Sequence, residues 1–83
     1  METAIRIKSL SDIKTDSICY WYEDNSWWIY LPKCGAGRLD NHSVFEYEDK
    51  TITVKPSILL TGHDNGISKV RHGYLTKGIW NEI

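Results

Sequence analysis

The chain has 83 residues, of which 10 are Lys or Arg and 11 are Asp or Glu, so its formal net charge at pH 7 is -1. A chain of this length suits one domain, and we expect residues 1–83 to fold as a single unit. The near-neutral charge argues against nonspecific DNA binding and against mimicry of DNA, because both require a strong long-range electrostatic field.

The sequence contains no segment that indicates a membrane or a secreted location. No stretch approaches the roughly 20 apolar residues that a membrane-spanning helix requires, and the first residues lack the apolar core of a signal peptide. We therefore expect a cytoplasmic protein that does not bind membranes. In that compartment Cys19 and Cys34, the only two cysteines, are expected to be free thiols.

The first third of the chain predicts a strand, a helical turn and a hairpin. Residues 5–8 alternate apolar and basic side chains, which is the pattern of a strand with one wet face. Residues 9–14 can form at most one short helix, because the segment is too short for independent helical stability. Residues 18–22 and 27–31 are rich in β-forming residues and flank a polar four-residue loop, which predicts a hairpin.

The middle of the chain predicts a long loop and a second hairpin. Residues 32–42 contain a proline and two glycines that interrupt strand pairing, so we expect a loop there. Residues 43–48 alternate in polarity, and the turn after them leads into residues 51–54, which completes the hairpin. Pro56 should end this hairpin or lie at a sheet edge, because proline cannot donate a hydrogen bond to a neighbouring strand.

A third strand pair is predicted at the end of the chain. After residues 58–60, the segment 62–66 is turn-like, and its Asn65-Gly66 pair suits a tight hairpin turn with positive φ angles. Residues 68–75 and 78–80 should then pair with each other through a turn at Thr76-Lys77.

Together these segments predict a mainly β fold, with an antiparallel sheet of about six short strands arranged as an open barrel or a small sandwich. One helix at most is expected, near residues 9–14. The residues that we expect in the core are Ile18, Tyr20, Trp27, Ile29, Val44, Ile52, Val54, Ile58 and Val70.

Aromatic residues are dense, with four Trp and five Tyr in the chain, and most of them lie within residues 20–30. A domain of this size buries only about 60–65 % of the surface of its unfolded chain, so some rings should stay accessible. Adjacent residues of a strand point to opposite faces, so one of Trp27 and Trp28 should be core and the other surface. We place Trp28 and Tyr30 on the binding side, and an error of one residue in facing would exchange the two sets.

The residue types allow two kinds of ligand site, a zinc site and an anion-binding loop. Cys34, His42, His63 and His72 are ligand types that zinc prefers, but their spacing matches no common zinc motif. Solvent-facing or hydrogen-bonding histidines with a buried thiol are the alternative. Residues 32–37 form either a structural turn or an anion-binding loop.

A nucleotide is the second small ligand that the residue types allow. The cations that could contact its phosphates are Lys33, Arg38, Lys69 and Arg71, although surface cations are most often only solvated.

Several segments, in their order and spacing, resemble a family of small bacterial and phage proteins of unknown function that is often labelled "ammonia monooxygenase" in phage genomes. These segments are residues 27–37, 51–58, 62–63, 71–75 and 78–80. The resemblance implies a phage or prophage origin and a location in the host cytosol. Members of the family look like metal-binding domains with several cysteines, whereas here Leu31 and Ala36 stand at expected cysteine positions. The resemblance therefore implies either a metal site at Cys34, His63 and His72 or the loss of the metal.

Three functions follow as hypotheses. The first, which we favour, is a non-enzymatic phage counter-defence protein that neutralises a host protein or sequesters a small nucleotide through an aromatic surface, with Trp28, Tyr30 and Tyr74 as contacts. The second is a zinc-dependent hydrolytic or metal-binding domain. The third is a structural or assembly component. No cofactor is expected under the first hypothesis, and surplus aromatic area makes a homodimer an open option.

Overall fold

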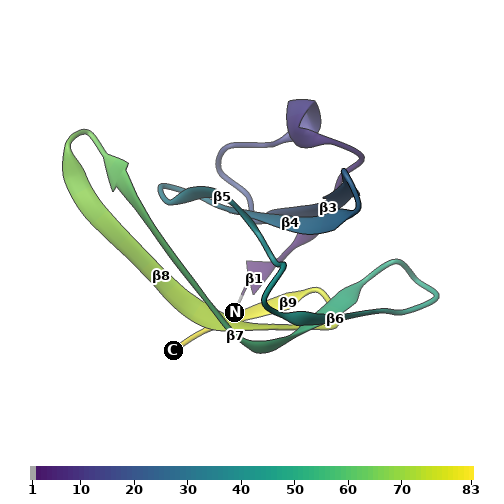
Figure 1. Ribbon diagram of the computed structural model, residues 1–83. Coiled ribbons are helices and arrows are strands. Elements are labelled where there is room, and N and C mark those ends of the chain that lie inside the picture. The colour runs from purple at the N-terminus through teal and green to yellow at the C-terminus, as the bar shows by residue number, and fades with distance from the viewer. Residues whose placement is uncertain (1) are drawn as a thin grey trace.

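The computed structural model describes residues 2–83 as two β-sheets that face each other (Figure 1). Its elements in chain order are β1 (Glu2–Thr3), β2 (Ile5–Arg6), the short 3-10 helix η1 (Leu10–Asp12), β3 (Cys19–Glu23), β4 (Ser26–Leu31), β5 (Gly35–Arg38), β6 (Ser43–Glu46), β7 (Ile52–Asp64), β8 (Ile67–Thr76) and β9 (Ile79–Glu82). The mainly β prediction and the single short helix near residues 9–14 are confirmed. The described chain has nine strands rather than six, and they do not close into a barrel.

The two sheets differ in strand direction. The five-stranded sheet has the order β1-β9-β8-β7-β6 and is antiparallel throughout. The four-stranded sheet has the order β2-β3-β4-β5, and β2 pairs with β3 in parallel. Only the buried Ala4 separates β1 from β2, so the N-terminal segment passes from one sheet to the other within one residue.

All three predicted hairpins are present, and two-residue turns connect β3 to β4, β7 to β8 and β8 to β9. Asp24 and Asn25 have φ angles of 54° and 60° and form a two-residue turn, because Glu23 already pairs with Ser26. The predicted turn at Asn65-Gly66 is confirmed, with φ angles of 53° and 80°. The last turn lies one residue later than expected, at Lys77-Gly78. Positive φ at both positions matches the twist of antiparallel strands and fixes their register.

Two backbone predictions were wrong. Part of the expected loop, Gly35–Arg38, is strand β5, which pairs with β4 despite its glycines. A β-carbon added at Gly37 would lie 2.7 Å from Cδ2 of Leu60, so the missing side chain lets β5 approach β7 closely. Residues 62–64, which were expected in a turn, belong to strand β7 and pair with β8.

Pro56 ends the pairing of β6 with β7, as expected, because Ser43 with Lys55 is the last pair, although β7 itself continues to Asp64. The register of β7 shifts between Val54 and Ile58, and this bulge takes the proline out of the regular ladder.

The core lies between the two sheets and takes side chains from both. Its buried members are Ala4, Ile18, Tyr20, Ile29, Leu31, Leu39, Ile52, Val54, Ile58, Leu75 and Trp80. Trp27 and Val44 are half-buried against this core, as expected. Val70 is a wrong core prediction, since 61 % of it is exposed. In β8 the buried Gly73 and Leu75 fix the inward parity, so Val70 points outward.

The β7–β8 hairpin is longer than the other strand pairs and rises beside β5 (Figure 1). The hairpin is in close contact with Cys34, the residue before β5. A β-carbon added at Gly62 would lie only 2.4 Å from the carbonyl oxygen of Cys34. Among residues 2–83 no helix is long and apolar enough to cross a membrane.

Candidate binding surface

The predicted surface aromatics Trp28 and Tyr30 do lie together, on the outer face of the four-stranded sheet. Residues 7–17 run over this face, and the Tyr30 hydroxyl donates a hydrogen bond to the carbonyl of Thr15 (3.1 Å). Trp28 stacks on Trp21, with ring centroids 6.1 Å apart and planes 8° from parallel. Arg38 stacks on Trp28, with its guanidinium carbon 5.2 Å from the ring centroid. These rings are therefore engaged in packing, with Trp21 buried and Trp28 and Tyr30 only half-exposed.

Three of the four cations predicted to contact phosphate are paired with carboxylates. Lys33 pairs with Asp64 (3.6 Å), on the β7–β8 hairpin. Arg38 pairs with Asp40 (3.1 Å), at the end of β5. Each has a carboxylate that already neutralises it.

Arg71 on β8 is paired with Glu82 (2.8 Å) and with Glu2. The hydrogen bond between Arg71 and Glu82 raises the pKa of the first and lowers the pKa of the second. Lys69 is opposite Gly62 and forms no ion pair with the described residues. A phosphate would therefore have to displace a carboxylate from three of these four residues.

The possible zinc ligands are also apart. Cys34 lies against the inward face of β7 at Gly62, whereas His63 and His72 are on the outward face. Their strand partners, Ser68 and Leu59, show that the two histidines are four positions apart along the hairpin, or about 13 Å. Within residues 2–83, no group of three or more His, Cys, Asp or Glu side chains could hold a metal ion.

The outer face of the five-stranded sheet is uncovered and carries exposed apolar side chains. Phe45, Leu59, Val70 and Tyr74 all point outward here and are exposed, Phe45 to 63 %. Of these, only Tyr74 was predicted as a contact. We call this surface the outer face.

Two adjoining hollows of about 440 and 600 Å³ mark the β6 end of the outer face. Both are lined by Ser43, Tyr47, Thr53 and Lys55, and the larger also by Tyr74. Tyr47 is well fixed there, because its ring contacts Phe45 (centroids 4.8 Å apart) and its hydroxyl lies 3.1 Å from Oγ1 of Thr53. Such a concave aromatic surface beside exposed aliphatic side chains can receive an apolar group.

The outer face carries no acidic side chain at any of its described strand positions. These positions are Thr3, Ser43, Phe45, Thr53, Lys55, Ser57, Leu59, Thr61, His63, Ser68, Val70, His72, Tyr74, Thr76, Ile79 and Asn81. Lys55 is basic, and Lys77 from the adjacent turn lies 5.3 Å from the ring centroid of Tyr47. The chain has 11 Asp and Glu residues, but none of them lies at these positions, so the outer face is more positive than the chain as a whole.

A Ser–His pair also lies on the outer face. The Ser57 hydroxyl is 2.8 Å from Nε2 of His72, and the Ser57 carbonyl is 3.0 Å from Nε2 of His42. A nucleophile and base at this separation need a third group to orient the base, and no described side chain hydrogen-bonds to Nδ1 of His72. We therefore interpret the pair as a contact that secures the bulge to β8.

The sequence contained a partial signal for the outer face. The alternation in residues 43–48 correctly put Phe45 and Tyr47 on the face opposite Val44. Nothing in that alternation indicated which of the two faces stays uncovered, because coverage depends on segments distant in the sequence.

No family model, curated protein or solved structure matches this chain. The resemblance to the small phage and bacterial family thus stays a prediction, carried only by the quoted segments.

Proposed function

We propose that this chain is a non-catalytic binding protein whose outer face binds an apolar surface of another protein that is ringed by carboxylates. The observation that carries the proposal is the combination of exposed Phe45, Leu59, Val70 and Tyr74 with no acidic side chain. Aromatic residues on such a surface are typical binding hot spots. Lysines at its edge attract an acidic partner and exclude basic ones.

The composition of the outer face favours a protein over a nucleic acid. Leu59 and Val70 offer neither stacking nor phosphate contacts, and Lys55 and Lys77 are too few for the backbone neutralisation on which nucleic-acid affinity depends. A second copy of the chain fits less well, because two outer faces would oppose like charges without a carboxylate between them.

The biological setting of the proposal comes from the resemblance. We infer that the partner is a bacterial host protein and that binding neutralises it, as a phage counter-defence protein would do. Such a protein acts stoichiometrically, so inhibition should saturate near one equivalent, and the partner should be released chemically unchanged after denaturation.

The test begins with a photo-crosslinking amino acid at position 45, used in bacterial cells to identify the protein in contact with the outer face. Affinity for that purified protein is then measured by calorimetry. We expect Phe45→Ala and Tyr74→Ala each to weaken binding by about 2 kcal/mol, or roughly 30-fold. Leu10→Ala is the matched control, since Leu10 is an exposed apolar residue on the segment over the opposite sheet.

Charge supplies a second readout on the same complex. Lys55→Glu should weaken binding, and the loss should be smaller at high salt, because the screened attraction is the part removed. Normal binding by both Phe45→Ala and Tyr74→Ala would contradict the proposal and place the interface elsewhere.

A further inference from the structure

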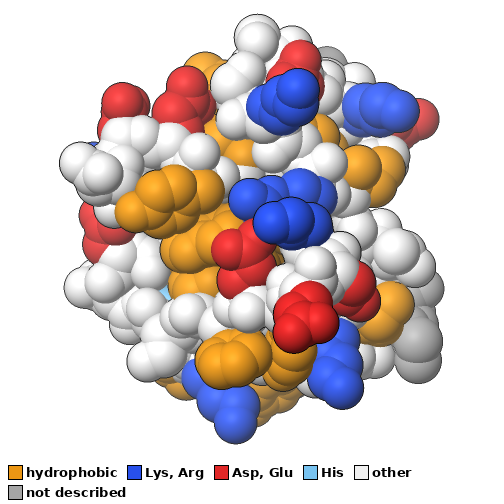
Figure 2. Space-filling view, turned by 90° about the vertical axis from the view of Figure 1, so that its right-hand side faces the viewer, with side chains coloured by type: hydrophobic (Ala, Val, Ile, Leu, Met, Phe, Trp, Pro, Cys, Tyr) orange, Lys and Arg blue, Asp and Glu red, His pale blue; other side chains and the backbone are white. Residues whose placement is uncertain are grey.

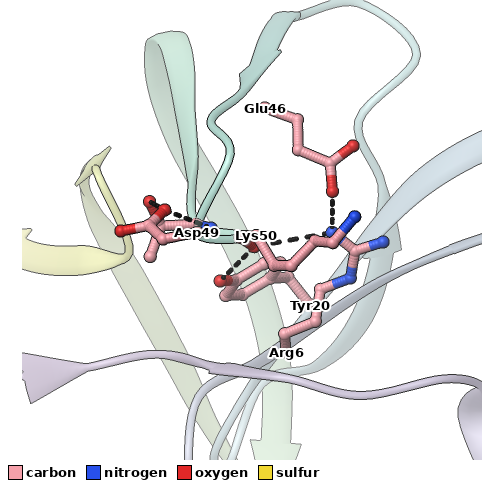
Figure 3. A network of polar contacts seen from close by, with 6 residues as sticks. Arg6, Tyr20, Glu46, Asp49 and Lys50 are labelled. Carbon is pink, nitrogen blue, oxygen red and sulfur yellow. Dashed lines mark hydrogen bonds and ion pairs between the residues drawn. The ribbon is translucent and has the colours of Figure 1, made fainter.

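One end of the space between the two sheets is closed by a polar network (Figure 3). Arg6 on β2 pairs with Glu46 on β6, and its guanidinium carbon lies 4.9 Å from the ring centroid of Trp27. The Tyr20 hydroxyl donates a hydrogen bond to the carbonyl of Lys50 (3.1 Å). Burial raises the pKa of Tyr20, so this hydroxyl keeps its proton and remains a donor at neutral pH. The network holds β2 and the β6–β7 turn in fixed positions.

An open hollow of about 450 Å³ lies beside this network, lined by Arg6, Ile7, Lys8, Tyr22 and Lys50. Its cations come from two separate segments, since Arg6 and Lys8 lie at β2 and Lys50 lies in the β6–β7 turn. That turn projects to the right in Figure 1, and Figure 2 views this side, with Lys and Arg side chains near its centre.

The charges in the hollow are unevenly compensated. Glu46 neutralises Arg6, but neither Lys8 nor Lys50 forms an ion pair with any residue of the described chain. Asp49, next to Lys50, is engaged instead with Thr51, from which it accepts hydrogen bonds at 2.6 and 3.0 Å. These bonds lower the pKa of Asp49. Two ammonium groups are therefore left to bind an anion.

The hollow also offers an aromatic ring. Tyr22 is 49 % exposed, and an edge contact with Trp27 (centroids 5.2 Å apart, planes at 66°) orients it. An exposed ring beside two cations suits a ligand that has both a planar group and a phosphate, because bases stack on tyrosine and phosphates bind ammonium groups. The volume is within the range of small-molecule sites.

From these observations we propose that the hollow binds a small nucleotide, with its phosphates between Lys8 and Lys50 and its base against Tyr22. Arg6 serves as a positioning residue, since Glu46 already occupies its guanidinium. This site is separate from the outer face and does not depend on the function proposed for it.

The test is isothermal titration calorimetry of the whole chain with ADP, pyrophosphate and adenosine. ADP should bind, and the double variant Lys8→Gln/Lys50→Gln should weaken this at least about tenfold, because two charged hydrogen-bond donors are lost. The double variant Lys55→Gln/Lys77→Gln removes the same charge from the outer face and should leave ADP affinity unchanged. Each double variant includes one lysine with positive φ, so the two are matched for backbone strain.

Tyr22→Leu separates a nucleotide from a simple anion. It should weaken ADP binding and leave pyrophosphate binding unchanged, whereas adenosine alone should bind weakly or not at all. Absence of ADP binding, or equal losses in the two double variants, would overturn the site. Pyrophosphate binding as tight as that of ADP, with no effect of Tyr22→Leu, would overturn its assignment to nucleotides. Thermal melting of each variant checks that the fold is intact.

Discussion

The outer faces of the two sheets both carry aromatic side chains, but another segment of the chain runs over only one of them. On the four-stranded sheet, residues 7–17 run over the outer face and leave Trp21 only 1 % exposed. On the five-stranded sheet no described segment runs over Phe45 or Tyr74, which stay open to solvent. The two faces differ in whether a connecting segment of the chain, such as residues 7–17, covers them.

This difference in coverage determines which aromatic residues serve packing and which are available for binding. The densest aromatic segment, residues 20–30, supplies core and covered rings apart from the exposed Tyr22, whereas the proposed contacts Phe45 and Tyr74 come from less conspicuous strands. Aromatic density in the sequence thus located a packing centre. The candidate binding surface lies on the other side of the molecule.

The largest expected effect compares one ring from each face. Trp21→Ala should lower the free energy of unfolding by about 3 to 5 kcal/mol, because it leaves a cavity under residues 7–17. Phe45→Ala should change it by no more than about 0.5 kcal/mol. Urea denaturation measures both. A Phe45→Ala loss close to that of Trp21→Ala would show that the outer face is also covered.

A smaller effect is expected for the hydroxyl groups of one tyrosine on each face. Tyr30→Phe removes the hydrogen bond to Thr15 and should destabilise the chain by roughly 0.5 to 1.5 kcal/mol. Tyr74→Phe should be close to neutral, since no hydrogen bond links its hydroxyl to the described residues. Hydrogen exchange should also become faster in residues 10–17 of the Tyr30→Phe variant alone. Unchanged exchange there would mean that this bond does not secure the segment.

Local sequence signals were sufficient for much of the fold. Asn65-Gly66 and the alternation around Val44 marked hairpins correctly, because turn chemistry and period-2 patterning act over a few residues. The same signals gave wrong predictions where contacts between residues distant in the sequence determine the structure. Gly35–Arg38 is a strand because it pairs with β4 and packs against β7, and Val70 points outward because its parity is set by Gly73.

The candidate sites were harder to predict for the same reason. Lys8 and Lys50 are far apart in sequence and come together only because β2 and the β6–β7 turn meet at one end of the molecule. Trp28 and Tyr30 were placed correctly on one face, but residues 7–17 were not recognised as its cover. Strand patterns give the facing of a side chain relative to its neighbours. They do not show which other segment of the chain, if any, covers that side chain.

The passage of the chain between sheets at Ala4 also has a consequence for the order of folding. β1 pairs Glu2 with Trp80, almost the full length of the chain away, whereas the β3–β4 and β7–β8 hairpins connect near neighbours. Because closing a long loop costs more entropy, we expect the hairpins to form first and β1 to dock last. During synthesis, β1 must then remain unpaired until β9 has left the ribosome. Pulse-labelling hydrogen exchange would test this order, since Thr3 should gain protection after Ile29, and earlier protection of Thr3 would contradict it.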